Sequence, residues 1–227
     1  RPIEQERALS VLEELYSWGL GLPMPHERFS SALLACINNP SNPQCLVLAT
    51  QNLIAILGKH PSAFESILSS DPLTVLSSVL ERNAEQGIKQ NCAILSGMFA
   101  GHFPDYFNQK MGLPRFFRII EGFPKIALRD CLGFCYFQLS TQVIDRDAES
   151  IPLLIKYFSH QDEIIREKAM ECFTLLQKNN SIIIPPDCVQ TLLNTIPVDN
   201  PQITQAIWGL LEKAASSHPT AVKMLQN

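Results

Sequence analysis

Residues 159–176 read SHQDEIIREKAMECFTLL, and this stretch carries the pattern that decides the fold. Three apolar residues follow Ala169 at intervals of three, four and seven positions: Cys172, Phe173 and Leu176. This spacing places them on one face of an α-helix, where they can pack against neighbouring elements. The stretch therefore predicts an amphipathic helix that belongs to a larger helical assembly.

The same pattern recurs along the whole chain. Each recurrence aligns on one small or medium-sized residue, which we call the anchor, and apolar residues usually follow it at the same three intervals. The anchors are Ala8, Ala49, Ala93, Cys131, Ala169 and Ile207. The fit is weakest at Ala93, where Ser96 and Gly97 replace the expected apolar residues. The chain is therefore predicted to repeat a unit of about 40 residues five or six times.

A second, shorter helical segment is expected between the anchored helices. Its starts are marked by prolines, which are favoured in the first turn of a helix because their missing N–H group needs no partner there. These starts are Pro72, Pro114, Pro152 and Pro186, and residues 29–37 form the equivalent segment in the first unit. Asp71 and Ser150 are expected to cap two of these helices.

Two stretches are similar to parts of an armadillo repeat. Residues 112–121, GLPRFFRIIE, resemble the start of its second helix, and residues 159–176 resemble its third helix with a short acidic lead-in. The resemblance implies an all-α fold, a right-handed α-solenoid of five to six armadillo/HEAT-like repeats. It implies a single domain over residues 1–227, which we expect to be a fragment of a longer protein.

The resemblance also implies where a partner would bind. In armadillo-type solenoids, the positions two and six residues after the anchor line a concave groove. The implied groove residues are Leu95, Phe99, Phe137 and Leu175, bordered by Asn91, Arg129 and Glu171. The alternative is that these side chains pack against neighbouring repeats. The Trp and Asn ladder by which importin-type repeats bind nuclear signals is absent from these positions.

Composition excludes several classes of function. The 227 residues are 46% hydrophobic and only 18% charged, with a net charge of −4. This composition is too apolar for a disordered chain and too weakly charged for a polyanion binder. One basic and aromatic stretch, residues 110–129, is too small to predict nucleic-acid binding. No run of about 18–20 apolar residues predicts membrane insertion.

No pattern predicts catalysis or a cofactor. The sequence lacks a phosphate-binding loop, a nucleophile elbow and a zinc-ligand spacing, so we expect no enzyme, small-molecule substrate, cofactor or metal. His60, His102 and His218 are interpreted as helix-end residues because each is close to a following proline. Seven scattered cysteines predict reduced core thiols and an intracellular, most simply cytoplasmic, location, with cytoskeletal or nuclear association as alternatives.

The leading functional hypothesis is a non-enzymatic scaffold for protein–protein interaction, which binds a peptide or a partner domain along the concave solenoid face. Two alternatives stay open: an Hsp70 nucleotide-exchange cofactor of armadillo type, and a tubulin- or microtubule-binding module similar to TOG domains. The sequence does not define the oligomeric state. Because the last helical segment carries few charges, we expect it either to continue into further sequence or to contact a partner.

Overall fold

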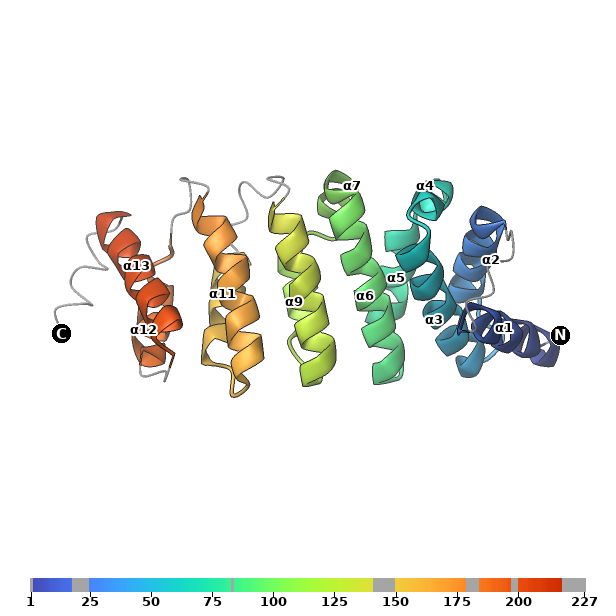
Figure 1. The fold of residues 1–227 in the computed structure, drawn as a ribbon, viewed down its shortest axis with the longest axis horizontal. Helices are drawn as coiled ribbons and strands as arrows, with labels where there is room; N and C mark the ends of the chain where they lie inside the picture. Colours follow the sequence, from blue (N-terminus) through green and yellow to red (C-terminus); the bar gives the residue numbers. More distant parts are fainter. Residues whose placement is uncertain are drawn as a thin grey trace. The chain divides into compact units, whose positions relative to one another are not determined.

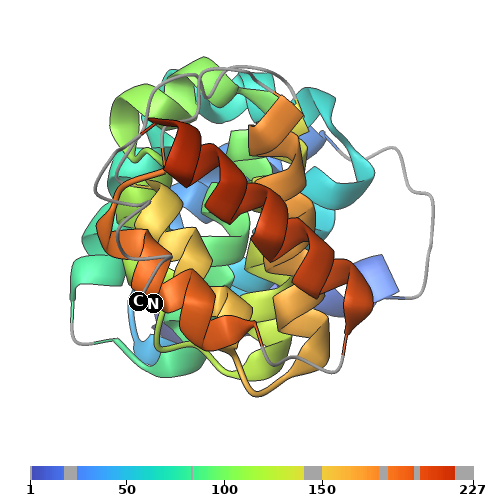
Figure 2. The same ribbon diagram turned by 90° about the vertical axis from the view of Figure 1, so that its left-hand side faces the viewer.

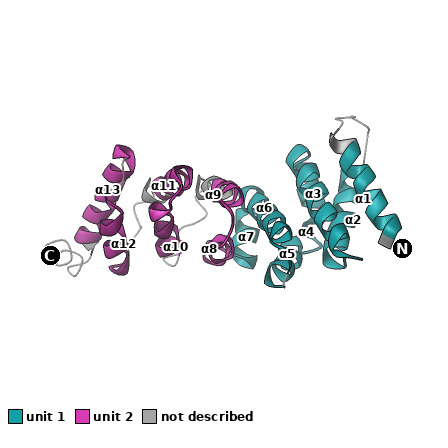
Figure 3. Ribbon diagram, turned by 90° about the horizontal axis from the view of Figure 1, so that it is seen from below, with its two compact units in different colours: residues 1–111 teal, residues 112–227 magenta. Residues whose placement is uncertain are grey.

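The structure is a computed structural model that describes residues 2–17, 25–82, 84–140, 150–178, 184–196 and 200–217 (Figure 1). All regular secondary structure within these ranges is helical, which confirms the all-α class. The helices cluster into two compact units, residues 1–111 and residues 112–227 (Figure 3). We describe each unit by itself, and the expectation of one domain over the whole chain stays a prediction.

Unit 1 contains seven helices among its described residues. They are α1 (Pro2–Ser17), α2 (His26–Asn38), α3 (Pro43–Lys59), α4 (Ser62–Leu68), α5 (Pro72–Glu81), α6 (Gln86–His102) and α7 (Pro104–Lys110). The long helices contact one another in chain order, α1 with α3 and α3 with α6, while α2 packs on α3 and α5 packs on α6. The side chains of Phe64, Phe99 and Phe107 are fully buried in the core of this unit.

Unit 2 repeats this arrangement in a simpler form. It contains α8 (Leu113–Ile120), α9 (Lys125–Ser140), α10 (Ser150–Lys156), a 3-10 turn (Tyr157–Ser159), α11 (Glu163–Lys178), α12 (Asp187–Thr195) and α13 (Pro201–Ser217). The long helices α9, α11 and α13 contact one another in chain order, and so do the shorter α8, α10 and α12. At the end of the unit, α12 and α13 lie side by side (Figure 2).

Side-chain hydrogen bonds between corresponding elements of successive repeats span about 40 residues; in one of them the donor, Tyr157, lies in the 3-10 turn after α10. They join Asn52 to Leu9 (43 residues apart, 3.0 Å), Asn91 to Thr50 (41 residues, 3.1 Å), Tyr157 to Phe117 (40 residues, 3.4 Å) and Cys172 to Leu132 (40 residues, 3.3 Å). The period of about 40 residues expected from the sequence is therefore also the distance along the chain between helices that touch.

Several helix boundaries follow the prolines and histidines of the sequence. Helix α5 begins at Pro72, and Pro114 lies in the first turn of α8. Helix α3 ends just before His60, whose backbone N–H donates to the Ile56 carbonyl at 2.8 Å. Helix α6 ends at His102, whereas His218 is outside the described residues. The interpretation of His60 and His102 as helix-end residues is confirmed.

Neither of the two residues expected as N-terminal caps forms a side-chain capping hydrogen bond, although Asp71 does lie at the N-cap position of α5. Asp71 has a left-handed backbone with a φ of 50°, and its side chain accepts no hydrogen bond from the backbone of α5. The hydroxyl of Tyr106, from α7, accepts the Leu73 N–H instead, at 3.2 Å. Ser150 is the first residue of α10, and its buried hydroxyl has no hydrogen-bond partner. Tertiary contacts therefore replace a local cap at the start of α5.

Two short helices, α4 and α7, were not expected. Each follows a long helix of unit 1, and each has only seven residues, too few to give a periodic signal. Their aromatic residues explain why they form, because Phe64 in α4 and Phe107 in α7 are completely buried. Burial of these aromatic side chains packs each short helix against the core of the unit.

Candidate partner-binding surface

The predicted groove residues of α6 are part of the core of unit 1. Leu95 and Phe99 are both 0% exposed. The ring of Phe99 packs edge-on against Phe64, with 5.0 Å between ring centroids. The physical reason is that α3, α5 and α7 all contact α6, so positions expected to face a groove are covered. The prediction that Leu95 and Phe99 line an open binding surface is wrong.

Asn91 also makes a contact within unit 1 instead of facing an open groove. Its side chain is half-buried, and its amide nitrogen donates to the hydroxyl of Thr50 at 3.1 Å. Thr50 in turn donates to carbonyls of its own helix, α3. The pair therefore links α6 to α3 within unit 1. This contact agrees with the second interpretation of the sequence, in which the predicted groove residues pack against a neighbouring repeat.

In unit 2, two of the predicted site residues are exposed. Arg129, in α9, donates two hydrogen bonds of 3.1 Å to the carboxylate of its neighbour Asp130. Glu171, in α11, accepts a hydrogen bond of 2.6 Å from Lys168. Phe137 and Leu175 fall within α9 and α11, but their side chains lie outside what the structure describes. Helices α9 and α11 contact each other, so Arg129 and Glu171 belong to adjoining elements.

The same two helices expose a pair of isoleucines that the sequence reasoning missed. Ile126 is 67% exposed and Ile164 is 41% exposed. Each lies five residues before its anchor, so they occupy the same place in consecutive repeats. An isoleucine at this place recurs in the sequence, which is a signal that could have been found. The signal is ambiguous, however, because Ile88 has the same place in α6 and is only 2% exposed.

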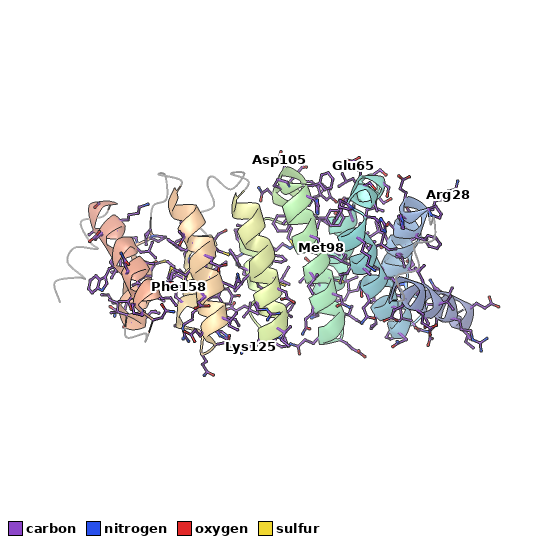
Figure 4. The ribbon with its side chains drawn as sticks, in the orientation of Figure 1. Arg28, Glu65, Met98, Asp105, Lys125 and Phe158 are labelled. Carbon is purple, nitrogen blue, oxygen red and sulfur yellow. The ribbon has the colours of Figure 1, made fainter. Side chains whose placement is uncertain are left out.

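An ion pair brings the first turns of α9 and α11 together. Lys125, at the start of α9 (Figure 4), pairs with the carboxylate of Asp162, immediately before α11. The same carboxylate accepts the N–H groups of Ile164 (3.1 Å) and Ile165 (3.4 Å), the usual role of an N-cap residue. The hydrogen bond from Lys125 is the main reason that the pKa of Asp162 is lowered. Ile126 and Ile164 therefore lie at the same end of the two helices.

We call the exposed residues of this region the α9–α11 surface. Within each helix, the residues of this surface are three or four positions apart, so they share one face of the helix. They are Ile126 and Arg129 from α9, and Ile164, Glu167 and Glu171 from α11. The surface therefore combines two aliphatic side chains at one end with charges of both signs beyond them.

A polar cluster in unit 1 has a structural role. The carboxylate of Asp71 accepts hydrogen bonds from Tyr106 (2.7 Å), Lys110 (2.7 Å) and Thr74 (2.8 Å). Burial alone would raise the pKa of Asp71, but these three donors lower it below its ordinary value. Burial raises the pKa of the Tyr106 hydroxyl, so it stays protonated and can donate. The cluster ties α7 to the start of α5.

Five of the six cysteines whose side chains are described are buried. Burial raises the pKa of the Cys131 and Cys172 thiols to about 12, so both are protonated near neutral pH. No group of three or more His, Cys, Asp or Glu side chains in the described part of the chain could hold a metal ion.

Two histidines of unit 1 stack on each other. The ring centroids of His26 and His60 are 3.5 Å apart. The pKa of His26 is lowered, mainly by burial and then by the charge of His60.

Two further expectations concern nucleic acids and membranes. The aromatic residues Phe116 and Phe117, in the stretch with the densest basic residues, are each only 1% exposed and belong to the core of unit 2. They are therefore unable to stack on bases in this structure. Among the described helices, none has the length and hydropathy needed to cross a membrane.

Comparison with known proteins gives information on the fold alone. No protein-family profile matches the chain, and no curated protein is detectably similar in sequence. The chain is similar to a crystal structure of an engineered protein from the Northeast Structural Genomics Consortium, with 12% identity, a TM-score of 0.63, and coverage of 96% of this chain and 92% of the other. A second engineered protein from the same consortium matches with 12% identity and a TM-score of 0.60, over 86% of this chain and 49% of the other.

These similarities are consistent with a helical repeat fold, and they identify no armadillo or HEAT family. At 12% identity they say nothing about function. The candidate surface therefore has to be judged from its own residues.

Proposed function

We propose that this chain is a non-enzymatic protein-binding scaffold, built as a right-handed solenoid of five to six armadillo/HEAT-like repeats. Two features support the solenoid: long helices contact each other in chain order within each unit, and the hydrogen bonds between equivalent helices span about 40 residues. The curvature of helical solenoids creates the extended concave surfaces with which these proteins bind partners.

The observation that carries the binding function is the exposure of Ile126 and Ile164. Single exposed aliphatic residues are common on soluble proteins and need no explanation. Here two isoleucines occupy the same place in adjoining helices, and the Lys125–Asp162 ion pair holds those helix ends together. A paired apolar patch with a charged border is typical of a surface that buries itself against a partner.

The charges on the α9–α11 surface indicate the chemistry of the partner. Helix α11 exposes Glu163, Glu167 and Glu171, whereas the beginning of α9 provides Lys125 and Arg129. A peptide or helix with apolar anchors for the two isoleucines, and basic residues directed toward α11, would match both features. We therefore propose that the α9–α11 surface binds such a segment.

The test is affinity capture from a cell extract with quantitative mass spectrometry. The double variant Ile126→Asp/Ile164→Asp should reduce recovery of the specific partner by about tenfold or more, since buried interface anchors contribute over 1 kcal/mol each. Ile3→Asp is a matched control because Ile3, in α1, is also an exposed isoleucine, at 66% against 67% for Ile126. Circular dichroism should show the same helix content for all three proteins.

The proposal fails if the double variant captures the same partners as the wild type while remaining folded. If Ile3→Asp loses them equally, the binding surface is not the one defined by α9 and α11. Recovery of an Hsp70 or of tubulin would direct the next experiment, nucleotide release in the first case and co-pelleting in the second.

A further inference from the structure

Two cysteines of unit 1 lie on either side of the short connector between α2 and α3. Cys36 is two residues before Asn38, the last residue of α2, and Cys45 is two residues after Pro43, the first residue of α3. The two helices pack against each other, and a connector as short as residues 39–42 makes them antiparallel. The two cysteines therefore occupy opposing positions in a helical hairpin.

The beginning of α1 is hydrogen-bonded to the surroundings of both cysteines. The amide nitrogen of Gln5 donates to the sulfur of Cys36 at 2.8 Å. The carboxylate of the next residue, Glu6, accepts from the amide nitrogen of Asn42 at 3.2 Å. The side-chain oxygen of Asn42 in turn accepts the backbone N–H of Cys45 at 2.7 Å. Two consecutive residues of α1 are thus linked to one cysteine directly and to the other through Asn42.

The electrostatic interactions of Cys45 agree with this arrangement. The pKa of its thiol is raised, mainly by burial, then by the charge of Glu6, and in smaller part by the charge of Cys36. A charged group shifts the pKa of a neighbour in this way at short range. The pKa is also raised for four other cysteines, but no other described cysteine is among the causes: Cys92, Cys131, Cys172 and Cys188.

The two thiols differ in their access to solvent. Cys45 is 0% exposed, whereas Cys36 is half-buried and is the one described cysteine that is not classed as buried. A small reagent in solution therefore reaches the sulfur of Cys36 first. Cys45 is shielded from such a reagent, but it adjoins any product formed at Cys36.

We propose that Cys36 and Cys45 form a reversible disulfide when the chain meets a low-molecular-weight disulfide such as glutathione disulfide, so that the hairpin is a redox-sensitive clasp between α2 and α3. The Cys36 thiolate attacks one sulfur of the oxidant, and one glutathione leaves as its thiolate. The Cys45 thiolate then attacks the Cys36 sulfur of this mixed disulfide and releases the second glutathione. In total, the two cysteines lose two protons and two electrons, and glutathione disulfide is reduced to two molecules of glutathione.

The test is equilibration of the whole 227-residue chain, without denaturant, in mixtures of reduced and oxidised glutathione, followed by peptide mass mapping under non-reducing conditions. We expect a pair of peptides joined through Cys36 and Cys45, which excess reduced glutathione separates again. Cys36→Ser should form no such link, and Cys45→Ala should accumulate the mixed disulfide of Cys36 with glutathione. Cys92→Ala is the matched control, because it removes another buried cysteine of unit 1 and should form the link as the wild type does.

Thermal unfolding shows whether the folded chain accommodates the link. The oxidised wild type should keep its helix content by circular dichroism and unfold at a higher temperature than the reduced form, because a cross-link restricts the unfolded chain. The proposal is overturned if Cys36 of the wild type stays a thiol or a mixed disulfide at every glutathione ratio, if it links to a different cysteine, or if the linked chain unfolds at a lower temperature. The hairpin belongs to unit 1, so none of these results depends on partner binding at the α9–α11 surface.

Discussion

Replacing Phe99 with alanine tests directly whether this residue belongs to the core of unit 1 or to a binding groove. Its side chain is completely buried, and its ring lies 5.0 Å from Phe64 and 6.2 Å from Tyr106, measured between centroids. Removal of a buried phenylalanine ring destabilises a protein by about 3–5 kcal/mol, because apolar burial is lost and a cavity remains.

The expected loss is large compared with the total stability of a domain, which is about 5–15 kcal/mol. A loss of about 4 kcal/mol corresponds to a decrease in Tm of roughly 8–16 °C for a chain of this size. Urea denaturation followed by circular dichroism measures the free energy change, and differential scanning calorimetry measures Tm. Ile126→Ala is the control, since Ile126 is 67% exposed and its truncation should change stability by about 0.5 kcal/mol or less.

One result would refute the placement of Phe99 in the core. If Phe99→Ala unfolds with the midpoint of the wild type but no longer captures a protein partner, the side chain is accessible and the groove suggested by the armadillo resemblance is real. If it is destabilised as expected, any loss of binding at temperatures where it remains folded has to come from another cause.

Three further predictions concern single contacts. Asn52→Ala removes the donor to the Leu9 carbonyl and should destabilise the chain by about 1–3 kcal/mol; hydrogen exchange in α1 should become faster, and unchanged exchange there would contradict the proposed link between α1 and α3. The folded-state pKa of Asp71 lies below its ordinary value of 3.8, so the stability it contributes is complete above that pH and is lost as the pH falls through the folded pKa. The difference in unfolding free energy between the wild type and Asp71→Asn should therefore be constant near neutral pH and shrink below about pH 4; a difference that persists in acid would show that the carboxylate charge is unimportant. The Cys172 thiol, buried and with a pKa of about 12, should resist a thiol reagent at pH 8 in the folded protein, whereas the half-buried Cys36 should react before it; early labelling of Cys172, detected by peptide mass mapping, would contradict its burial.

The sequence predicted the helices better than it predicted their surroundings. The anchor at Ala169 and the prolines at Pro72 and Pro114 correctly placed a long helix and two short ones, because helical periodicity and proline geometry act within a few residues. The short helix α7 was missed because its formation depends on burial of Phe107, a contact made in three dimensions.

At the candidate site, too, the sequence predicted the helices correctly but not which of their residues are buried. Arg129 and Glu171 are exposed, whereas Leu95 and Phe99 are buried by three neighbouring helices. The exposed pair Ile126 and Ile164 has the same sequence pattern as the buried Ile88. A periodic pattern tells which residues share a face of a helix, and it contains no information on how many faces the neighbours cover.

By itself, the sequence determined that the chain is helical, that its helices recur about every 40 residues, and where several of them begin and end, since these properties depend on local backbone preferences and on spacing. Only the tertiary structure decided which apolar positions are covered. Trp208 and Met170 hold the same place after their anchors, yet Trp208 is 48% exposed and Met170 is 8% exposed. The difference arises because α13 packs beside α11, and no described long helix follows α13 in its unit.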